Sequence, residues 1–263
     1  MRENRLRSLW AEDKAVVNGW LHIPTSFSAE TMAHAGWDSL TIDMQHGVVD
    51  YLAAVNMLTA ISTTATVPIV RVPWLDPGIL MKMLDAGAYG VICPMVNNRR
   101  DAEALVSATR YPPKGQRSFG PVRATLYAGA DYAKHANETI VAFAMIETKE
   151  ALDNLDDIFS VEGLEAIYIG PSDLSLALGC TPKFDQEEKP VVEAIDLILR
   201  KARERGIVAG IHNGTPEYAR RMIDKGFRFV TIASDARLIA SGARAILDKM
   251  RADGVQAAKP GGY

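Results

Sequence analysis

The chain has 263 residues, of which 48% are hydrophobic and 23% charged, with a formal net charge of −3 and 2 cysteines. This composition excludes intrinsic disorder and collagen-like architectures, and the cysteines lack the number and spacing of a disulfide framework or a zinc site. The slightly acidic balance gives no electrostatic reason to expect a nucleic-acid partner. Because the sequence shows neither a signal-peptide pattern nor a run of 18 apolar residues, we expect a cytoplasmic protein without a membrane span.

Short apolar, β-branched runs recur along the chain and are typical of strands buried on both faces. The predicted strands are 16–23, 39–44, 67–72, 90–96, 140–146, 164–170, 207–212 and 229–233. Capped segments of helical period accompany them at 50–64, 76–87, 100–111, 148–159, 191–205, 216–225 and 236–252.

Eight strand signals alternating with helices predict an α/β fold, a single-domain (β/α)8 TIM barrel over residues 1–253, followed by a flexible tail at 254–263. The alternative, an open doubly wound sheet, would favour a GxGxxG motif after the first strand, and the sequence has none. Two stretches, 112–129 and 179–189, are predicted to be irregular loops. Loops of this length in a compact domain are usually functional or contact another subunit.

Polar residues follow the predicted strands at the edge where a barrel of this kind builds its active site. Glu147 and Arg71 end buried runs and need polar partners there. Glu147 and Asp173 follow adjacent strands, and two converging carboxylates repel unless a proton or a cation lies between them. A hard divalent cation suits such a pair. We expect substrate oxygens, such as those of a 2-oxo acid, to complete its coordination.

Three further features complete the candidate site. Arg71 can bind an oxyanion through its forked guanidinium, and His46, with Asp43 close in sequence, is the candidate base. His212 is a second choice for which a structural role is favoured, and the other three histidines look incidental. Main-chain N–H groups at the helix start Gly170-Pro171-Ser172 are predicted to bind a carboxylate.

Other chemistries are less favoured by the same pattern. A glycosidase would also place two carboxylates at strand ends, but few aromatic residues lie near them to stack a sugar. A Schiff-base mechanism needs a lysine at a strand end, and none is found there. The loops after the last two strands hold one glycine between them, which disfavours a phosphorylated substrate.

Several segments together resemble the HpcH/HpaI aldolases, which are class II, divalent-metal-dependent pyruvate aldolases. The resemblance spans roughly residues 10–250, and its most specific motifs are IETKEAL and IGPSDLS. The segments that carry it are 37–51, 67–74, 83–96, 111–121, 144–152 and 166–175.

The resemblance implies roles for individual residues. Glu147 and Asp173 would hold Mg²⁺, Mn²⁺ or Co²⁺, Arg71 would bind the pyruvyl or enolate oxygen, and His46 would act as acid/base, paired with Asp85. This chain departs from many members of the family in two places. Gln45, a predicted substrate-binding residue, stands where many members have Glu, and Met145 stands where they have Gln.

The resemblance also implies a reaction and an assembly. The reaction is reversible cleavage of a 4-hydroxy-2-oxo acid to pyruvate, or hydroxypyruvate, and an aldehyde, so the expected partners are small molecules. The assembly is a hexamer, a trimer of dimers, in which the last helix is exchanged between subunits. Two alternatives stay open: a citrate lyase β-like carbon–carbon lyase acting on an acyl-CoA or citramalyl substrate, and a non-catalytic metabolite-binding barrel.

Overall fold

The computed structural model describes residues 1–252 and shows a closed barrel of eight parallel strands that pair in sequence order. This confirms the predicted (β/α)8 barrel; the predicted tail at 254–263 lies outside the described residues. The strands are β1 (Val16–Leu21), β2 (Ser39–Asp43), β3 (Val67–Arg71), β4 (Gly90–Cys93), β5 (Val141–Ile146), β6 (Ala166–Ile169), β7 (Val208–Asn213) and β8 (Phe229–Ser234).

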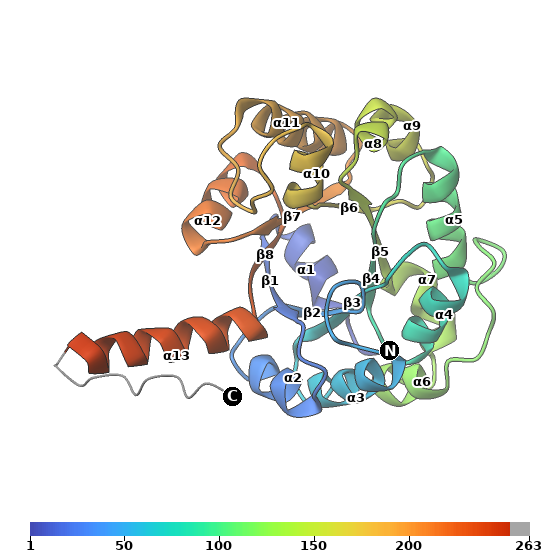
Figure 1. The fold of residues 1–263 in the computed structure, drawn as a ribbon. Helices are drawn as coiled ribbons and strands as arrows, with labels where there is room; N and C mark the ends of the chain where they lie inside the picture. The colour runs from blue at the N-terminus through green and yellow to red at the C-terminus, as the bar shows by residue number, and fades with distance from the viewer. Residues whose placement is uncertain (253–263) are drawn as a thin grey trace.

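Helices surround the ring of strands (Figure 1). Six helices that follow a strand are preceded by a Thr, Asp or Asn as N-cap residue. Its side chain accepts a hydrogen bond from a main-chain N–H group in the first turn of the helix. The helices are α1 (Arg5–Ala11), α2 (Ser26–Ala33), α3 (Tyr51–Ile61), α4 (Pro77–Asp85), α5 (Arg99–Thr109), α6 (Val122–Ala128), α7 (Tyr132–Thr139), α8 (Lys149–Asp153), α9 (Leu155–Phe159), α10 (Pro171–Ala177), α11 (Lys189–Glu204), α12 (Pro216–Lys225) and α13 (Asp235–Ala252).

Two sequence predictions about the helices are wrong in detail. The stretch 112–129 is not wholly irregular, because α6 occupies its end and α7 follows. No side-chain cap marks the start of α6, so the usual sequence signal of a helix start is missing. The single helix predicted at 148–159 is two short helices, α8 and α9, separated at Asn154.

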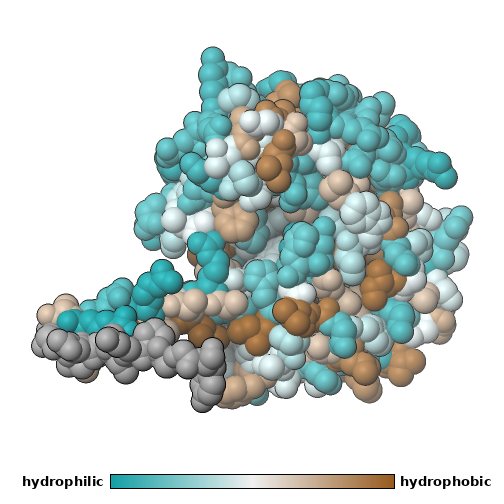
Figure 2. Space-filling view, in the orientation of Figure 1, coloured by the Kyte–Doolittle hydropathy of each residue, from teal (hydrophilic) through white to brown (hydrophobic). Residues whose placement is uncertain are grey.

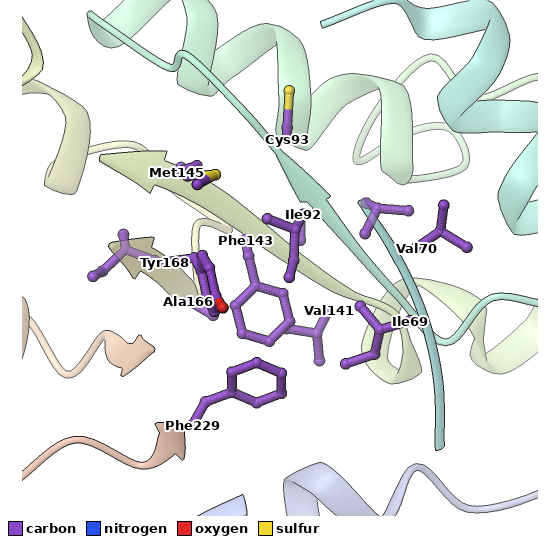
Figure 3. Close-up of a cluster of buried hydrophobic side chains, with 14 of the residues drawn as sticks. Ile69, Val70, Ile92, Cys93, Val141, Phe143, Met145, Ala166, Tyr168 and Phe229 are labelled. Carbon is purple, nitrogen blue, oxygen red and sulfur yellow. The ribbon is translucent and has the colours of Figure 1, made fainter. Parts of the chain in front are cut away.

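Apolar side chains fill the interior of the barrel, because strands covered by helices are buried on both faces. Figure 3 shows part of this core, contributed by β3, β4, β5, β6 and β8. The rings of Phe143 and Phe229 lie 4.9 Å apart at its centre. The barrel is thus a packed solid, and a ligand can enter only at its ends.

Helix α1 closes one end, which we call the base. Asn4 donates to the main-chain oxygen of Tyr89, just before β4, at 3.2 Å. Arg7 donates to that of Ile140, before β5, at 3.0 Å. Trp10 donates to the oxygen of Arg228, before β8, at 2.8 Å. Because all these contacts are with the amino ends of strands, the carboxyl ends, which we call the mouth, remain free to form a site.

Helix α13 projects away from the barrel (Figure 1), and Asp235 is its only buried residue. Figure 2 shows hydrophobic surface where this helix leaves the barrel. Its exposed large apolar side chains are Leu238, Ile239, Ile246, Leu247 and Met250. Such a face is unusual on a helix that stays in water; exchange of α13 between subunits stays a prediction.

Within residues 1–252, no helix is both long enough and apolar enough to cross a membrane.

Candidate active site

A cavity of about 280 Å³ opens at the mouth of the barrel. Most of the residues predicted from the sequence line it, together with four aromatic or imidazole side chains that were not assigned to the site. The lining residues are Trp20, His22, His46, Arg71, Met145, Gly170, Pro171, Ser172, Asp173, Phe184, His212, Ala233, Ser234 and Arg237.

Glu147 is only 2% exposed and is not one of the residues that line this cavity; its carboxylate lies directly behind Gly170, which does line it. Its Oε1 accepts the main-chain N–H of Met95 at 2.9 Å. Met95 follows β4 with a φ of 57°, a left-handed conformation that is uncommon for a residue with a side chain. Gly170 leaves room for the other oxygen, because a Cβ there would overlap Oε2. The backbone of two neighbouring strand ends therefore shapes a place for this carboxylate.

The charge of Glu147 is poorly compensated within the chain. Burial raises the pKa of Glu147 to about 7, the hydrogen bond from Met95 opposes this, and the nearby Asp173 carboxylate raises it further. No hydrogen bond to Oε2 occurs within residues 1–252. A cation between Glu147 and Asp173 would relieve both the repulsion and the cost of burial.

The donors present fit a hard divalent cation. Carboxylate oxygens are the ligands that Mg²⁺ and Mn²⁺ favour. In the described part of the chain no cluster of three or more His, Cys, Asp or Glu side chains could hold a metal ion, so Glu147 and Asp173 would be a two-carboxylate site. Two carboxylates leave coordination positions for oxygens of substrate and water.

Asp43 organises the opposite side of the cavity. It is fully buried, and its carboxylate accepts hydrogen bonds from Nε and Nη2 of Arg71 at 2.8 and 2.6 Å. Trp20 donates to it at 3.1 Å, and the main-chain N–H groups of Gln45 and His46 donate at 3.0 and 3.3 Å. Burial alone would raise the pKa of Asp43, but hydrogen bonds from His22 and Arg71 and the Arg71 charge hold it well below its usual range.

Arg71 is fixed by this pairing and by the Trp20 ring, whose centroid lies 4.8 Å from its guanidinium carbon. Both nitrogens on one edge of the guanidinium are used by Asp43. Nη1 donates to no group of residues 1–252, and Arg71 lines the cavity. The Nη1 group is therefore available to donate to a ligand oxygen.

His22, one of the three histidines that looked incidental in the sequence, belongs to this cluster. Its Nε2 lies 3.2 Å from Oδ2 of Asp43, and its ring lines the cavity. One signal could have found it: the parallel register pairs Leu21 of β1 with Ile42 of β2, which puts position 22 beside position 43.

Of three further residues predicted for the site, one lines the cavity and two do not. His46 lines the cavity, but its ring makes no hydrogen bond within residues 1–252. Gln45 does not line the cavity, and its buried Oε1 has no partner in the described chain. Asp85 ends α4, accepts from Arg117 at 2.6 Å and does not line the cavity. One chain thus does not bring Asp85 to His46, and their pairing stays a prediction.

His212 packs within the cavity wall. Its Nδ1 lies 3.0 Å from the hydroxyl of Tyr168, which itself donates to Thr231 at 2.8 Å. Burial, assisted by the charge of Arg71, lowers the pKa of His212 to about 3. The ring is therefore neutral, as the favoured structural role requires. Phe184 covers it, with ring centroids 4.5 Å apart.

The loop that carries Phe184 is anchored by its next two residues. Asp185 accepts the N–H of Gly214 and the hydroxyl of Thr215, each at 2.7 Å. Buried Gln186 donates to Ser175 at 2.7 Å and to main-chain oxygens of its own loop. These contacts hold in place the part of the predicted irregular stretch 179–189 that carries Phe184, the residue by which this stretch lines the cavity.

Known proteins resemble this chain over almost its whole length. The family model for HpcH/HpaI aldolase/citrate lyase matches residues 19–242. A hydroxypyruvate/pyruvate aldolase of Rhizorhabdus wittichii is 44% identical over 249 residues, 95% of this chain and 99% of that protein. A 4-hydroxy-2-oxo-heptane-1,7-dioate aldolase of Escherichia coli is 35% identical over 264 residues, 99% and 100% of the two chains. A family protein from Burkholderia cenocepacia superposes with a TM-score of 0.87 at 29% identity, covering 94% and 99% of the two chains.

A barrel with paired carboxylates and a fixed arginine at its mouth, together with aldolase relatives of nearly full length, defines a carbon–carbon lyase. The chain belongs to the HpcH/HpaI aldolase/citrate lyase family.

Proposed function

We propose that the chain is a divalent-metal-dependent aldolase that reversibly cleaves a 4-hydroxy-2-oxo acid to pyruvate, or hydroxypyruvate, and an aldehyde. The arrangement that supports it most directly is a cavity lined by Asp173 and Arg71, with the buried Glu147 carboxylate directly behind Gly170 of the same lining. Nη1 of Arg71 makes no hydrogen bond within residues 1–252. Relatives at 44% and 35% identity that are named aldolases favour this reaction over a citrate lyase-type one.

Glu147 and Asp173 are the residues that would hold the metal, as Mg²⁺, Mn²⁺ or Co²⁺. A divalent cation bound there supplies Lewis acidity, which polarises the carbonyl of a 2-oxo acid. The first turn of α10 offers the main-chain N–H groups of Ser172 and Asp173 to the substrate carboxylate; Pro171 has no N–H and can only shape the wall.

Arg71 stabilises negative charge on the carbonyl oxygen as the bond between C3 and C4 breaks. Because Asp43 and Trp20 already fix its guanidinium, no reorganisation is needed when the charge develops. His46 takes the proton of the 4-hydroxyl group in the cleavage direction and returns it in condensation. Its proposed partner, Asp85, would have to come from a second subunit, since within one chain Arg117 binds that carboxylate.

A homo-oligomer, as a hexamer of exchanged dimers, is part of the proposal. The apolar side chains exposed along α13, among them Ile239 at 62% and Ile246 at 67%, need a partner surface. A second copy of this chain carries the same apolar helix and is always present wherever the first copy is, so it can provide that partner surface.

The test is retro-aldol cleavage of 4-hydroxy-2-oxo acids by Arg71→Ala and Glu147→Gln, with Mg²⁺ or Mn²⁺ present. Each is expected to stay folded and to lose about 100-fold or more in rate, the range found when an electrostatic or acid–base group is removed. Glu138→Gln, an exposed carboxylate at the base, is the matched control and keeps wild-type activity. Wild-type rates in either site variant would refute the assignment. A panel of aldehydes with pyruvate and hydroxypyruvate identifies the acceptor and donor.

A further inference from the structure

The main chain of His22 is held from two sides at the end of β1. Its N–H donates to Oδ1 of Asp235, at the end of β8, at 2.9 Å. Its carbonyl accepts the N–H of Val48, in the loop after β2, at 3.1 Å. The place of the imidazole in the cavity is therefore set by the barrel rather than by a mobile loop.

The contact with Asp43 also fixes which ring nitrogen carries a proton. Asp43 is ionised and can only accept, because its pKa lies well below the usual range. The His22 nitrogen that faces it, Nε2 at 3.2 Å, must then be the donor. In the neutral ring this leaves the lone pair on Nδ1, the nitrogen that Asp43 does not bind. A carboxylate that orients an imidazole in this way is a general means of preparing a base.

The ring stands beside the proposed enolate-stabilising group. Nε2 of His22 lies 3.2 Å from Oδ2 of Asp43, and Nη2 of Arg71 donates to the same oxygen at 2.6 Å, so the imidazole and the guanidinium are neighbours on one oxygen. His46, in contrast, contacts Asp43 only through its main-chain N–H, and its ring is unrestrained within residues 1–252. Of these two imidazoles in the cavity lining, that of His22 is oriented by Asp43 and that of His46 makes no hydrogen bond within residues 1–252.

The surroundings of His22 also suit proton exchange with water. Its side chain is 35% exposed, while Asp43 is fully buried. The nearest other charged or titratable groups are Asp235, which binds its main-chain N–H, Arg71, paired with Asp43, and His212, which is neutral. The same cavity lining also contains His46, Asp173 and Arg237. An imidazolium formed at His22 would keep its Nε2–H bond to a carboxylate and could pass its Nδ1 proton to solvent.

We propose that His22, oriented by Asp43, transfers the proton at C3 of pyruvate. This assignment rests on the proposed aldolase function. The reaction has two proton transfers, one at C3 and one at the 4-hydroxyl group, and each is assigned to a different histidine. Nδ1 of His22 takes a proton from the methyl carbon, and the C–H electron pair forms the enolate, with its negative charge on the oxygen beside Arg71. In cleavage the same nitrogen returns a proton to C3, which releases pyruvate, while His46 serves the 4-hydroxyl group.

The experiment measures exchange of the pyruvate methyl protons with deuterated solvent by NMR, with Mg²⁺ present and no aldehyde, and compares it with retro-aldol cleavage. His22→Gln keeps an amide N–H that can donate to Asp43 but removes the base. It is expected to slow exchange about 100-fold or more, with the KM for pyruvate retained. His46→Gln is expected to slow cleavage by a similar factor and to leave exchange near the wild-type rate.

His135→Gln is the matched control. His135 also lies near an aspartate, with 3.5 Å between its Nε2 and Oδ2 of Asp131, but the pair is exposed at the base. This variant keeps both activities. If His22→Gln does not fold, His22→Ala replaces it, and added imidazole is expected to restore exchange, which a purely structural role of His22 would not allow.

Several results would overturn the proposal: wild-type exchange in His22→Gln, equal loss of exchange in His22→Gln and His46→Gln, or no rescue of folded His22→Ala by imidazole. Failure of the wild-type protein itself to exchange or to cleave would instead refute the aldolase function. The two failures are thus distinguishable.

Discussion

The two ends of the barrel each carry a histidine beside an aspartate, in very different surroundings. At the base, His135 and Asp131 are 44% and 46% exposed. At the mouth, Asp43 is 0% exposed and four further groups donate to it besides His22. Water screens the charges at the base, where Asp131 also pairs with the amino group of Met1. At the mouth, protein groups replace water, and the charges act on whatever fills the cavity.

Backbone strain follows the same division. Met95 and Ala233 lie at the mouth with φ of 57° and 58°, and both carry a Cβ that disfavours this conformation. At the base, Asp13 has a φ of 55°, but aspartate tolerates the left-handed region better. Strain maintained beside a cavity is common at functional sites. The mouth thus gives up some stability that the base retains.

The largest expected difference between the ends comes from neutralising each aspartate. Asp43→Asn leaves the Arg71 guanidinium buried without its counter-ion, which typically costs about 3–5 kcal/mol of unfolding free energy. Asp131→Asn removes only exposed contacts, so its urea midpoint is expected to equal that of the wild type. Urea unfolding of both variants makes the comparison. Equal midpoints for the two would show that burial does not separate the ends.

The pH dependence of the metal-free protein should report Glu147. Burial and the Asp173 charge raise the pKa of Glu147 from 4.5 to about 7, so the folded state binds this proton more tightly than the unfolded state. Stability is therefore lost as the pH rises from about 4.5 to 7, by at most about 3 kcal/mol. Urea unfolding in EDTA at pH 5 to 8 measures the loss, which Glu147→Gln should remove. If the stability of the wild type and of Glu147→Gln changed with pH in the same way, this prediction would be contradicted.

A divalent cation should restore that stability at the mouth. Mg²⁺ or Mn²⁺ at about 100 times its dissociation constant adds about 2.7 kcal/mol if it binds only the folded state. Thermal unfolding at pH 8, with and without EDTA, shows this as a rise in Tm. The rise should be absent in Glu147→Gln and present in Glu138→Gln, whose carboxylate lies at the base. A rise in Tm that survives Glu147→Gln would place the cation elsewhere.

The smallest effect concerns a polar residue of the mouth that has no role in the site. Asp76 caps α4 by accepting the N–H of Gly78 at 2.6 Å. Asp76→Ala should cost about 1 kcal/mol of stability and leave the cleavage rate unchanged. Denaturant unfolding and activity assays separate the two quantities. A large loss of activity would extend the functional surface beyond the cavity.

The fold and the carboxylates were predictable because their signals are local. A buried strand is a continuous apolar run, and a carboxyl group directly after one, as at Glu147, is conspicuous. The His22–Asp43 contact was not predictable in this way, because its two members follow different strands and only the register joins them. The donor that Met95 offers to Glu147 is a main-chain N–H, which no residue type reveals. The predicted pairing of Asp85 with His46 stays a prediction, because within one chain Arg117 binds the Asp85 carboxylate.

Asp235 lies at the place where the last strand of the barrel pairs with the first. The seven other strand pairs are joined by a connecting segment, but β8 and β1 meet where the chain has no covalent crossing. Asp235 bridges this seam, because its carboxylate accepts N–H groups of His22 and Ile23 and the hydroxyl of Ser28. The seam is therefore held closed by the first residue of α13. The part of α13 that follows Asp235 can therefore change position without breaking the pairing of β8 with β1.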